Sequence, residues 1–181
     1  LKVGLEMFTS EGPSSVEKLK EEGWKVFLDL KLHDIPNTVK AATESAGNIG
    51  ADFLTIHIAS GNEALDAAQE VKSNSMKILG VSSALTSKAF TSTTSDEVLN
   101  DFLKAKESNI DGVICPPSEI SRSKELFNLI VTPGIRLKND TNDDQKNITT
   151  PEKAIESGAD YLVMGRSIRN NIEYVVENLT L

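Results

Sequence analysis

Short apolar runs alternate along the chain with longer segments in which apolar residues recur at helical spacing. The opening stretch LKVGLEMF has the pattern of a strand end that runs into a loop. Six further apolar runs predict strands, at residues 24–32, 52–58, 77–83, 111–115, 129–134 and 160–165. Helices are predicted near residues 14–23, 36–49, 63–72, 96–108, 117–126, 151–157 and 171–179. The chain is therefore predicted to contain seven strands, each followed by helical structure.

Apolar strands that alternate with amphipathic helices favour a parallel sheet with right-handed crossovers. An open doubly wound sheet is disfavoured, because no Gly-x-Gly-x-x-Gly turn follows an early strand. We therefore predict an α/β fold of the (β/α)8 TIM-barrel class, with the first strand absent from this sequence. Residues 1–181 are expected to form a single barrel domain that is incomplete at its N-terminus. The polar run 137–150 has the length of an active-site loop.

Composition and charge narrow the function classes. With 39% hydrophobic and 25% charged residues, the chain has the composition of a soluble globular protein. Its formal net charge of −8 argues against a nucleic-acid-binding surface, which needs clustered Lys and Arg. No apolar run approaches the roughly 20 residues of a membrane span, so we expect a cytoplasmic protein without membrane contact. Cys115, the only cysteine, is expected to be a buried and inert thiol.

The stretch FLDLKLHDIPNTV, residues 27–39, places charged residues in a strand that is otherwise apolar. On a regular strand Asp29 and Lys31 project to the same face, while Leu28, Leu30 and Leu32 project to the other. The leucines are expected to pack under the helices, and the two charged residues to face the barrel interior near the carboxyl end of the strand, where barrel enzymes place catalytic groups. The alternative is a buried ion pair without a chemical role.

Asp34 and the two histidines have plainer interpretations when the residues are considered alone. Asp34 lies past the strand and just before Pro36, so it is expected to cap the following helix. His33 and His57 lie at strand ends without carboxylates or cysteines at metal-ligand spacing, so they are expected to be hydrogen-bonding structural residues.

A second group of chemistry-bearing residues follows the last two strands. Gly134 and Arg136 in TPGIR, and Gly165 and Arg166 in MGRSI, come after what are strands seven and eight of a complete barrel. Loops at these two positions commonly form a phosphate site, where glycine lets the backbone approach and arginine supplies paired donors. The two motifs together predict a phosphorylated substrate.

FLDLKLHDIPNTV closely resembles the signature of the orotidine 5'-phosphate decarboxylase family. The resemblance extends in family order through LKVGLEMF, LTS at 85–87, DGVIC, VTPGIR, NDDQK and MGRSI, and covers nearly the whole chain. It implies a (β/α)8 barrel that converts orotidine 5'-phosphate to UMP and CO2, the final step of de novo pyrimidine synthesis. It also implies a homodimer with shared active sites, and neither metal nor organic cofactor.

The resemblance assigns roles by matching motifs. Four residues correspond to the family's alternating charge network: Lys2, Asp29, Lys31 and Asp34. Asp34 is implied to come from the neighbouring subunit with Ile35 and Thr38, in place of the helix cap. Thr86 resembles the residue that contacts the pyrimidine. The residues that resemble the family's phosphate-binding residues are Arg136, Gln145, Gly165 and Arg166. The family's first strand ends in a ribose-contacting aspartate that has no counterpart here.

Two other functions are compatible with parts of the pattern. A magnesium-dependent sugar-phosphate decarboxylase or aldolase shares Asp-x-Lys-x-x-Asp, although DIPNT is typical of the orotidylate enzymes. A non-catalytic phosphate-binding fragment is the second alternative, and it predicts UMP binding without turnover.

Overall fold

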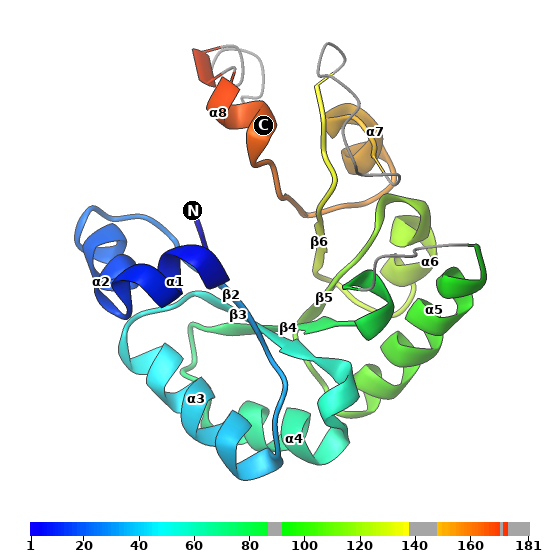
Figure 1. Cartoon of the computed structure of the whole chain (residues 1–181). Helices are drawn as coiled ribbons and strands as arrows, with labels where there is room; N and C mark the ends of the chain where they lie inside the picture. Colours follow the sequence, from blue (N-terminus) through cyan, green and yellow to red (C-terminus); the bar gives the residue numbers. More distant parts are fainter. Residues whose placement is uncertain (87–91, 138–147, 171, 174–181) are drawn as a thin grey trace. The chain divides into compact units, whose positions relative to one another are not determined.

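The computed structural model describes residues 1–86, 92–137, 148–170 and 172–173, without the side chains of residues 92–94, 166 and 170 (Figure 1). The chain forms two compact units, Leu1–Val113 and Ile114–Leu181, which are described separately. The single domain over residues 1–181 stays a prediction.

The first unit is built on parallel strands that are hydrogen-bonded to one another in chain order. These strands are β1 (Lys2–Gly4), β2 (Phe27–Leu32), β3 (Phe53–His57), β4 (Lys77–Val81) and β5 (Gly112–Ile114), whose first two residues end this unit. The helices are α1 (Leu5–Glu11), α2 (Ser14–Glu21), α3 (Pro36–Asn48), α4 (Asn62–Val71) and α5 (Ser92–Glu107), with short 3-10 turns η1 (Ile58–Ser60) and η2 (Ser83–Leu85). Helices α3 and α4 lie side by side (Figure 1).

The second unit continues the same alternation. Strands β6 (Ile130–Thr132) and β7 (Tyr161–Leu162) are parallel. Around them lie η3 (Pro117–Glu119), α6 (Ile120–Lys124), α7 (Pro151–Glu156) and α8 (Arg166–Asn170). None of the helices within the described ranges has the length and apolar character that a bilayer span requires.

The predicted alternation of seven parallel strands with helices is confirmed for the described residues. The prediction of a loop after the first strand is wrong, because Leu5–Glu11 forms the helix α1. The helix has only seven residues and none of them is buried, so its sequence is too short to show a helical period. A helix also begins earlier than predicted at the end of the chain, at Arg166, while most of the predicted helix 171–179 lies outside the described residues.

The central strands β3 and β4 of the first unit are buried on both faces, whereas β1 and β2 are only partly buried. In β3 the consecutive residues Leu54, Thr55 and Ile56 are all fully buried, and in β4 the same holds for Ile78 and Leu79. This double coverage explains why these strands appear in the sequence as continuous apolar runs and not as alternating ones.

Three aspartates stabilise the ends at which strands begin. We call Asp52, Asp111 and Asp160 the strand-entry aspartates, because each immediately precedes a strand: β3, β5 or β7. Each carboxylate accepts a backbone N–H at the start of the preceding strand in the sheet: Val26 N at 2.7 Å, Ile78 N at 2.9 Å and Ile130 N at 2.7 Å, respectively.

Each strand-entry aspartate also pairs with a lysine on or just after the helix that precedes the earlier of those two strands. These lysines are Lys20 on α2, Lys72 after α4 and Lys124 on α6. Two residues before each aspartate stands a residue with positive φ: Gly50 at 87°, Asn109 at 51° and Gly158 at 106°. A left-handed residue ends a helix and lets the chain turn into the next strand. The same combination of turn residue, aspartate and lysine therefore connects a helix, a turn and a strand at three places in the chain.

Cys115 follows β5, and its backbone N–H donates to Val131 O in β6 at 2.9 Å. The side chain is buried, and its Sγ lies 3.2 Å from the Ser123 hydroxyl. Burial raises the pKa of the thiol to about 12, so it carries no thiolate at neutral pH. The predicted inert thiol is confirmed.

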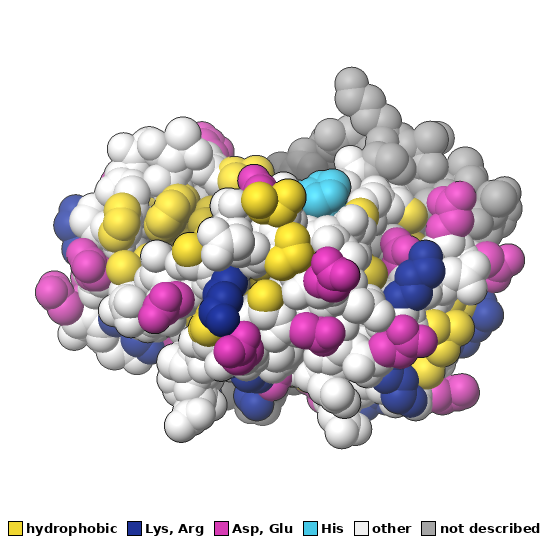
Figure 2. Space-filling view, turned by 90° about the horizontal axis from the view of Figure 1, so that it is seen from below, with side chains coloured by type: hydrophobic (Ala, Val, Ile, Leu, Met, Phe, Trp, Pro, Cys, Tyr) yellow, Lys and Arg dark blue, Asp and Glu magenta, His cyan; other side chains and the backbone are white. Residues whose placement is uncertain are grey.

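Acidic and basic side chains are interspersed on the face shown in Figure 2, with hydrophobic side chains grouped among them beside the visible histidine. The largest exposed fraction among the described large hydrophobic side chains belongs to Ile35, at 66%.

We predict that Asp111→Asn lowers the free energy of unfolding at pH 7 by about 1–3 kcal/mol, because two lysines lose their charged partner. Burial acts to raise the Asp111 pKa, but hydrogen bonds from Lys72, Ile78 N–H and Lys77 outweigh it, so the pKa lies below its ordinary value of 3.8. A carboxyl with a lowered pKa stabilises the fold above its unfolded-state pKa, and this contribution is lost as the pH falls below about 3.8.

Denaturant unfolding of both proteins from pH 7 to pH 3 provides the measurement. The difference between wild type and Asp111→Asn should shrink at the acid end. Asp66→Asn, at an exposed position on α4, is the control and should change little at any pH. Equal effects of the two substitutions would contradict the role of Asp111.

Candidate active site

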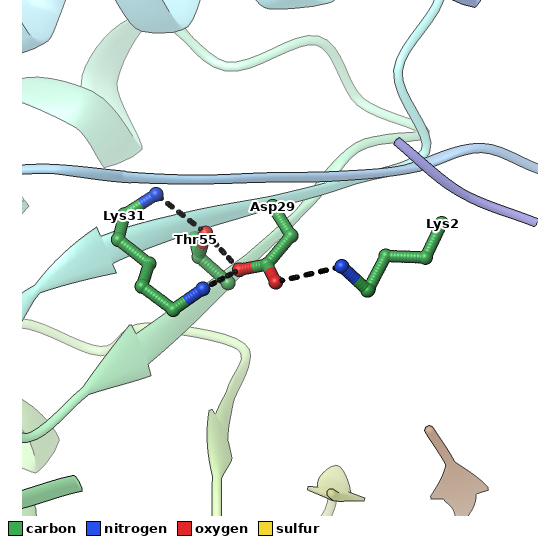
Figure 3. Close-up of polar contacts among 4 residues, drawn as sticks. All are labelled: Lys2, Asp29, Lys31 and Thr55. Carbon is green, nitrogen blue, oxygen red and sulfur yellow. Dashed lines mark hydrogen bonds and ion pairs between the residues drawn. The ribbon is translucent and has the colours of Figure 1, made fainter. Parts of the chain in front are cut away.

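Three adjacent strands of the first unit bring four side chains together at Asp29, and we call Lys2, Asp29, Lys31 and Thr55 the charge cluster (Figure 3). Lys31 Nζ donates to Asp29 Oδ1 at 2.8 Å, and Lys2 Nζ donates to Oδ2 at 3.2 Å. The Thr55 hydroxyl donates to Oδ1 at 3.0 Å. The Asp29 side chain is 13% exposed, whereas the lysines are 31% and 37% exposed. The carboxylate is thus enclosed, and the ammonium groups stay accessible to a ligand.

The surroundings of Asp29 keep it ionised. Burial is the largest influence on its pKa and acts to raise it, because the carboxylate loses hydration. The hydrogen bond and charge of Lys31, followed by those of Lys2, act in the opposite direction and prevail, so the pKa lies below its ordinary value of 3.8. With Asp29 ionised, the two lysines leave the cluster with one formal positive charge.

The backbone of β2 departs from a regular strand at Lys31. Leu28 pairs with Leu54, but Leu32 pairs with Ile56, so β2 has two more residues than β3 between these pairs. Lys31 has φ of 52°, and among the described non-glycine residues only it and Asn109 have positive φ. Such a conformation costs about 1–3 kcal/mol and persists only where the surroundings hold it.

This irregularity corrects the predicted side-chain alternation. Asp29 and Lys31 do meet, but through a bulge and not because a regular strand projects them together. Leu28 is buried as predicted, whereas Leu30 and Leu32 are only half-buried. A bulge re-aims side chains relative to the ideal period of two, and the apolar pattern contains no sign of it.

Gly4 leaves room for the Lys2 ammonium group. Gly4 pairs with Asp29 across β1 and β2, and a Cβ at Gly4 would lie 2.9 Å from Lys2 Nζ. Any side chain at this position must therefore displace the ammonium from the place where it meets Asp29.

Asp34 does not join the charge cluster of its own chain among the described contacts. Its Oδ1 accepts the backbone N–H of Ile35 at 2.8 Å. The helix-cap interpretation is wrong, because the cap residue of α3 is Ile35 and no side chain caps that helix. Asp34, Ile35 and Thr38 are all exposed, so the segment is available to another molecule.

Thr86 lies at the same end of the sheet as the charge cluster, because it follows β4 through η2 and the strands are parallel. It is exposed, and its hydroxyl donates to Ser83 O at 3.0 Å. The rings of His33 and His57 contact each other in a tilted arrangement, with centroids 5.1 Å apart and an interplanar angle of 43°. Burial, and then the charges of His33 and Lys31, lower the pKa of His57, so its ring is neutral at pH 7.

In the second unit the two Gly-Arg motifs are brought together. Gly134 has φ of 78° after β6, and Arg136 N–H donates to Thr149 O at 3.0 Å. The Ser167 hydroxyl in α8 donates to Ile135 O at 3.4 Å, which connects the loop after β6 to the helix after β7.

Gly165 is exposed immediately before α8, and the described atoms leave open space where a Cβ would stand. Arg166 begins α8, but its side chain lies outside the described residues, as does Gln145. The geometry of these two side chains therefore stays a prediction.

Thr55 is the member of the cluster that sequence reasoning missed. Its signal was a polar residue within the apolar run FLTIHI, flanked by two fully buried residues. Among the described residues, no group of three or more His, Cys, Asp or Glu side chains is placed to hold a metal ion.

The chain is similar to known proteins over nearly its whole length. Residues 1–177 match the family described as "Orotidine 5'-phosphate decarboxylase / HUMPS family". A Bacillus cereus protein named orotidine 5'-phosphate decarboxylase is 41% identical over 186 aligned positions, which cover 93% of this chain and 78% of the relative.

Solved structures give the same result. The crystal structure of orotidine 5'-phosphate decarboxylase from Lactobacillus acidophilus superposes with a TM-score of 0.76 at 29% identity, covering 99% of this chain and 86% of the other. An uncharacterized conserved protein from Geobacillus kaustophilus has a TM-score of 0.75 at 36% identity, covering 93% and 80%. The predicted TIM-barrel fold class is confirmed by this likeness. The match over nearly the whole chain and the level of identity to curated relatives show that this chain belongs to the orotidine 5'-phosphate decarboxylase / HUMPS family.

Proposed function

We propose that this chain decarboxylates orotidine 5'-phosphate to UMP and CO2, the final step of de novo pyrimidine nucleotide synthesis. The observation that carries the proposal is the Asp29 carboxylate held between the ammonium groups of Lys2 and Lys31. This arrangement occurs in a chain about 40% identical to proteins named for that reaction.

The chemistry requires a fixed positive charge. When the bond between C6 of the pyrimidine and the carboxylate carbon breaks, CO2 leaves and the electron pair stays on C6 in the plane of the ring. The π system cannot delocalise that pair, so stabilisation must come from preorganised electrostatics. The Lys31 ammonium supplies this charge and then transfers a proton from Nζ to C6, which gives UMP. Solvent returns the proton to Lys31.

The phosphate contacts are assigned to the second unit. Gly134, Arg136, Gly165 and Arg166 are proposed to bind the phosphate with Gln145, and Thr86 to contact the pyrimidine. The Ser167 to Ile135 hydrogen bond supports the first assignment, because it joins the two loops that carry the Gly-Arg motifs. Arginine suits a phosphate because its planar donors form paired, charge-assisted hydrogen bonds.

A homodimer with shared active sites is part of the proposal. Asp34, Ile35 and Thr38 are exposed beyond the end of β2, and Asp34 has no ion pair among the described residues of its own chain. Ile35, which is 66% exposed, would gain from burial against a second copy. Across a twofold axis, Asp34 would complete the charge network around Lys31 of the partner.

The proposed reaction uses neither metal nor organic cofactor and takes place in the cytoplasm. A buried, protonated thiol at Cys115 suits a reducing compartment. A magnesium-dependent sugar-phosphate decarboxylase or aldolase is disfavoured by the names of the curated relatives, and a chelator separates the two functions.

We predict that the purified protein consumes orotidine 5'-phosphate, followed by its absorbance, at the same rate with and without EDTA. Lys31→Ala should lower kcat by about 10⁴-fold or more, because both the cation and the proton donor are lost. The affinity for UMP, measured by calorimetry, should change by less than about tenfold, because the phosphate contacts remain.

Lys104→Ala is the matched control, because Lys104 is 67% exposed on α5 and pairs only loosely with Asp101, at 3.8 Å. It should retain wild-type activity. Turnover that EDTA abolishes would support the magnesium-dependent alternative, and UMP binding without turnover would support the non-catalytic one. A folded Lys31→Ala protein with near-normal kcat would remove Lys31 from the chemistry.

We predict that two inactive variants restore activity when their subunits are exchanged. In a hybrid of Asp34→Asn and Lys31→Ala subunits, one site receives an intact Lys31 from one chain and an intact Asp34 from the other. Random mixing should therefore recover about one quarter of wild-type activity, since about half the dimers are hybrids with one working site.

The control mixes Asp29→Asn with Lys31→Ala. Both positions lie on β2 of the same chain, so every hybrid site contains one defect and no activity should return. Hybrid dimers of the first pair that stay inactive would argue against sites shared through Asp34.

A further inference from the structure

Thr55 has an unusual position for a polar residue. It lies in the middle of β3 between Leu54 and Ile56, and its exposed fraction is 0%. A buried hydroxyl is unfavourable unless hydrogen bonds satisfy it. Thr55 Oγ1 makes two such bonds, and both lead to residues of the charge cluster (Figure 3).

The two bonds use the hydroxyl in opposite senses. Oγ1 donates its hydrogen to Asp29 Oδ1 at 3.0 Å, and it accepts the backbone N–H of Lys31 at 2.8 Å. A hydroxyl has one hydrogen and two lone pairs, so it can make both bonds at once. A valine has the same shape but can make neither.

Lys31 needs this contact because of its backbone. The register between β2 and β3 shifts between Leu28 and Leu32, and Lys31 has φ of 52° within that stretch. The bulge takes the Lys31 N–H out of the regular ladder, and the Thr55 side chain provides its acceptor. The strained conformation at Lys31 is therefore fixed from β3.

The Thr55 hydroxyl also holds the Asp29 carboxylate in place. Its Oδ1 accepts both the Thr55 hydroxyl and the Lys31 ammonium, the latter at 2.8 Å. A carboxylate held by a buried hydroxyl has a restricted side-chain orientation. The Lys31 side chain is then held at both ends: its ammonium bonds to the oriented Asp29 carboxylate, and its backbone N–H bonds to Thr55.

We propose that Thr55 is a positioning residue for the reaction: its hydroxyl clamps the Lys31 backbone and the Asp29 carboxylate together, and so fixes where the Lys31 ammonium is presented. The inference rests on the proposed decarboxylase function. It adds a residue that touches no substrate and acts only through Asp29 and Lys31.

The test compares Thr55→Val, which removes the hydroxyl, with Thr55→Ser, which keeps it. Thr55→Val should lower kcat for orotidine 5'-phosphate by about 10- to 100-fold, as expected for loss of one or two hydrogen bonds that orient a catalytic group. UMP affinity should stay within about threefold of wild type, because the phosphate contacts are untouched. Thr55→Ser should stay within about threefold of wild-type kcat, since a hydroxyl can make both bonds.

Thr43→Val is the matched control. Thr43 lies in α3 and is also fully buried, and its hydroxyl has no hydrogen-bond partner in the part of the chain that the structure describes. The same change of side chain there should leave kcat unaltered.

Amide hydrogen exchange at Lys31 gives a second readout that needs no substrate. Exchange at this amide should be about tenfold faster in Thr55→Val than in wild type, and near normal in Thr55→Ser and Thr43→Val. If wild type shows no turnover, the proposed function fails, and the exchange data still decide whether Thr55 clamps Lys31.

Three results would overturn the proposal: unchanged kcat in Thr55→Val, an equal loss in Thr55→Ser and Thr55→Val, or unchanged Lys31 exchange in Thr55→Val. If Thr55→Val does not fold, Thr55→Ser and Thr55→Ala replace the pair, because they differ by the hydroxyl alone. The serine variant should then be at least about tenfold more active, and equal activity would overturn the proposal.

Discussion

A carboxylate that is largely removed from water is unstable unless cations and hydrogen-bond donors surround it, and Asp29 meets this requirement from three strands at once. Lys2 approaches from β1, Lys31 from β2 itself and Thr55 from β3. These contacts hold the Asp29 pKa below its ordinary value in spite of burial. The same contacts fix the two ammonium groups, so the position of the Asp29 carboxylate determines where the positive charges of the site lie.

The two ends of the parallel strands have different tasks. At the ends where strands begin, Asp52, Asp111 and Asp160 each join a lysine to a backbone N–H of the preceding strand. Toward the carboxyl ends, the charge cluster and Thr86 hold groups that can meet a ligand. Aspartate and lysine serve in both places, but in the cluster the residue with positive φ, Lys31, is itself a member of the ion pair, whereas Asn109 only precedes Asp111 by two residues. Strain of this kind is characteristic of functional sites, where the surrounding structure supports it.

The fold class and the Asp29–Lys31 pair followed from the sequence, because the evidence for them is local, whereas Lys2 was assigned only through the family resemblance. Apolar runs marked the strands, and Asp29 and Lys31 were conspicuous because charge is rare in such runs. Helix α1 escaped prediction because seven residues are too few to show a helical period in the sequence. The bulge at Lys31 escaped because it depends on the register between β2 and β3, which the side-chain pattern of one strand does not encode.

Thr55 escaped for a related reason. Its importance lies in two contacts with another strand, and a single threonine in an apolar run gives little indication of its partners. For Asp34 the local sequence was misleading, because its position before Pro36 suggested a helix cap. Its carboxylate contacts only the Ile35 amide among the described residues, and no side chain caps α3.

The most direct test of this account is the pKa of Asp29, measured from its ¹³Cγ resonance over the pH range in which circular dichroism shows the native fold. The resonance is assigned by its loss in Asp29→Asn. The account predicts a pKa below 3.8 in the wild-type protein, and a higher value in Lys31→Ala, because the main hydrogen bond and charge that oppose burial are removed. A wild-type pKa at or above 3.8, or one that does not change when Lys31 is replaced, would contradict it.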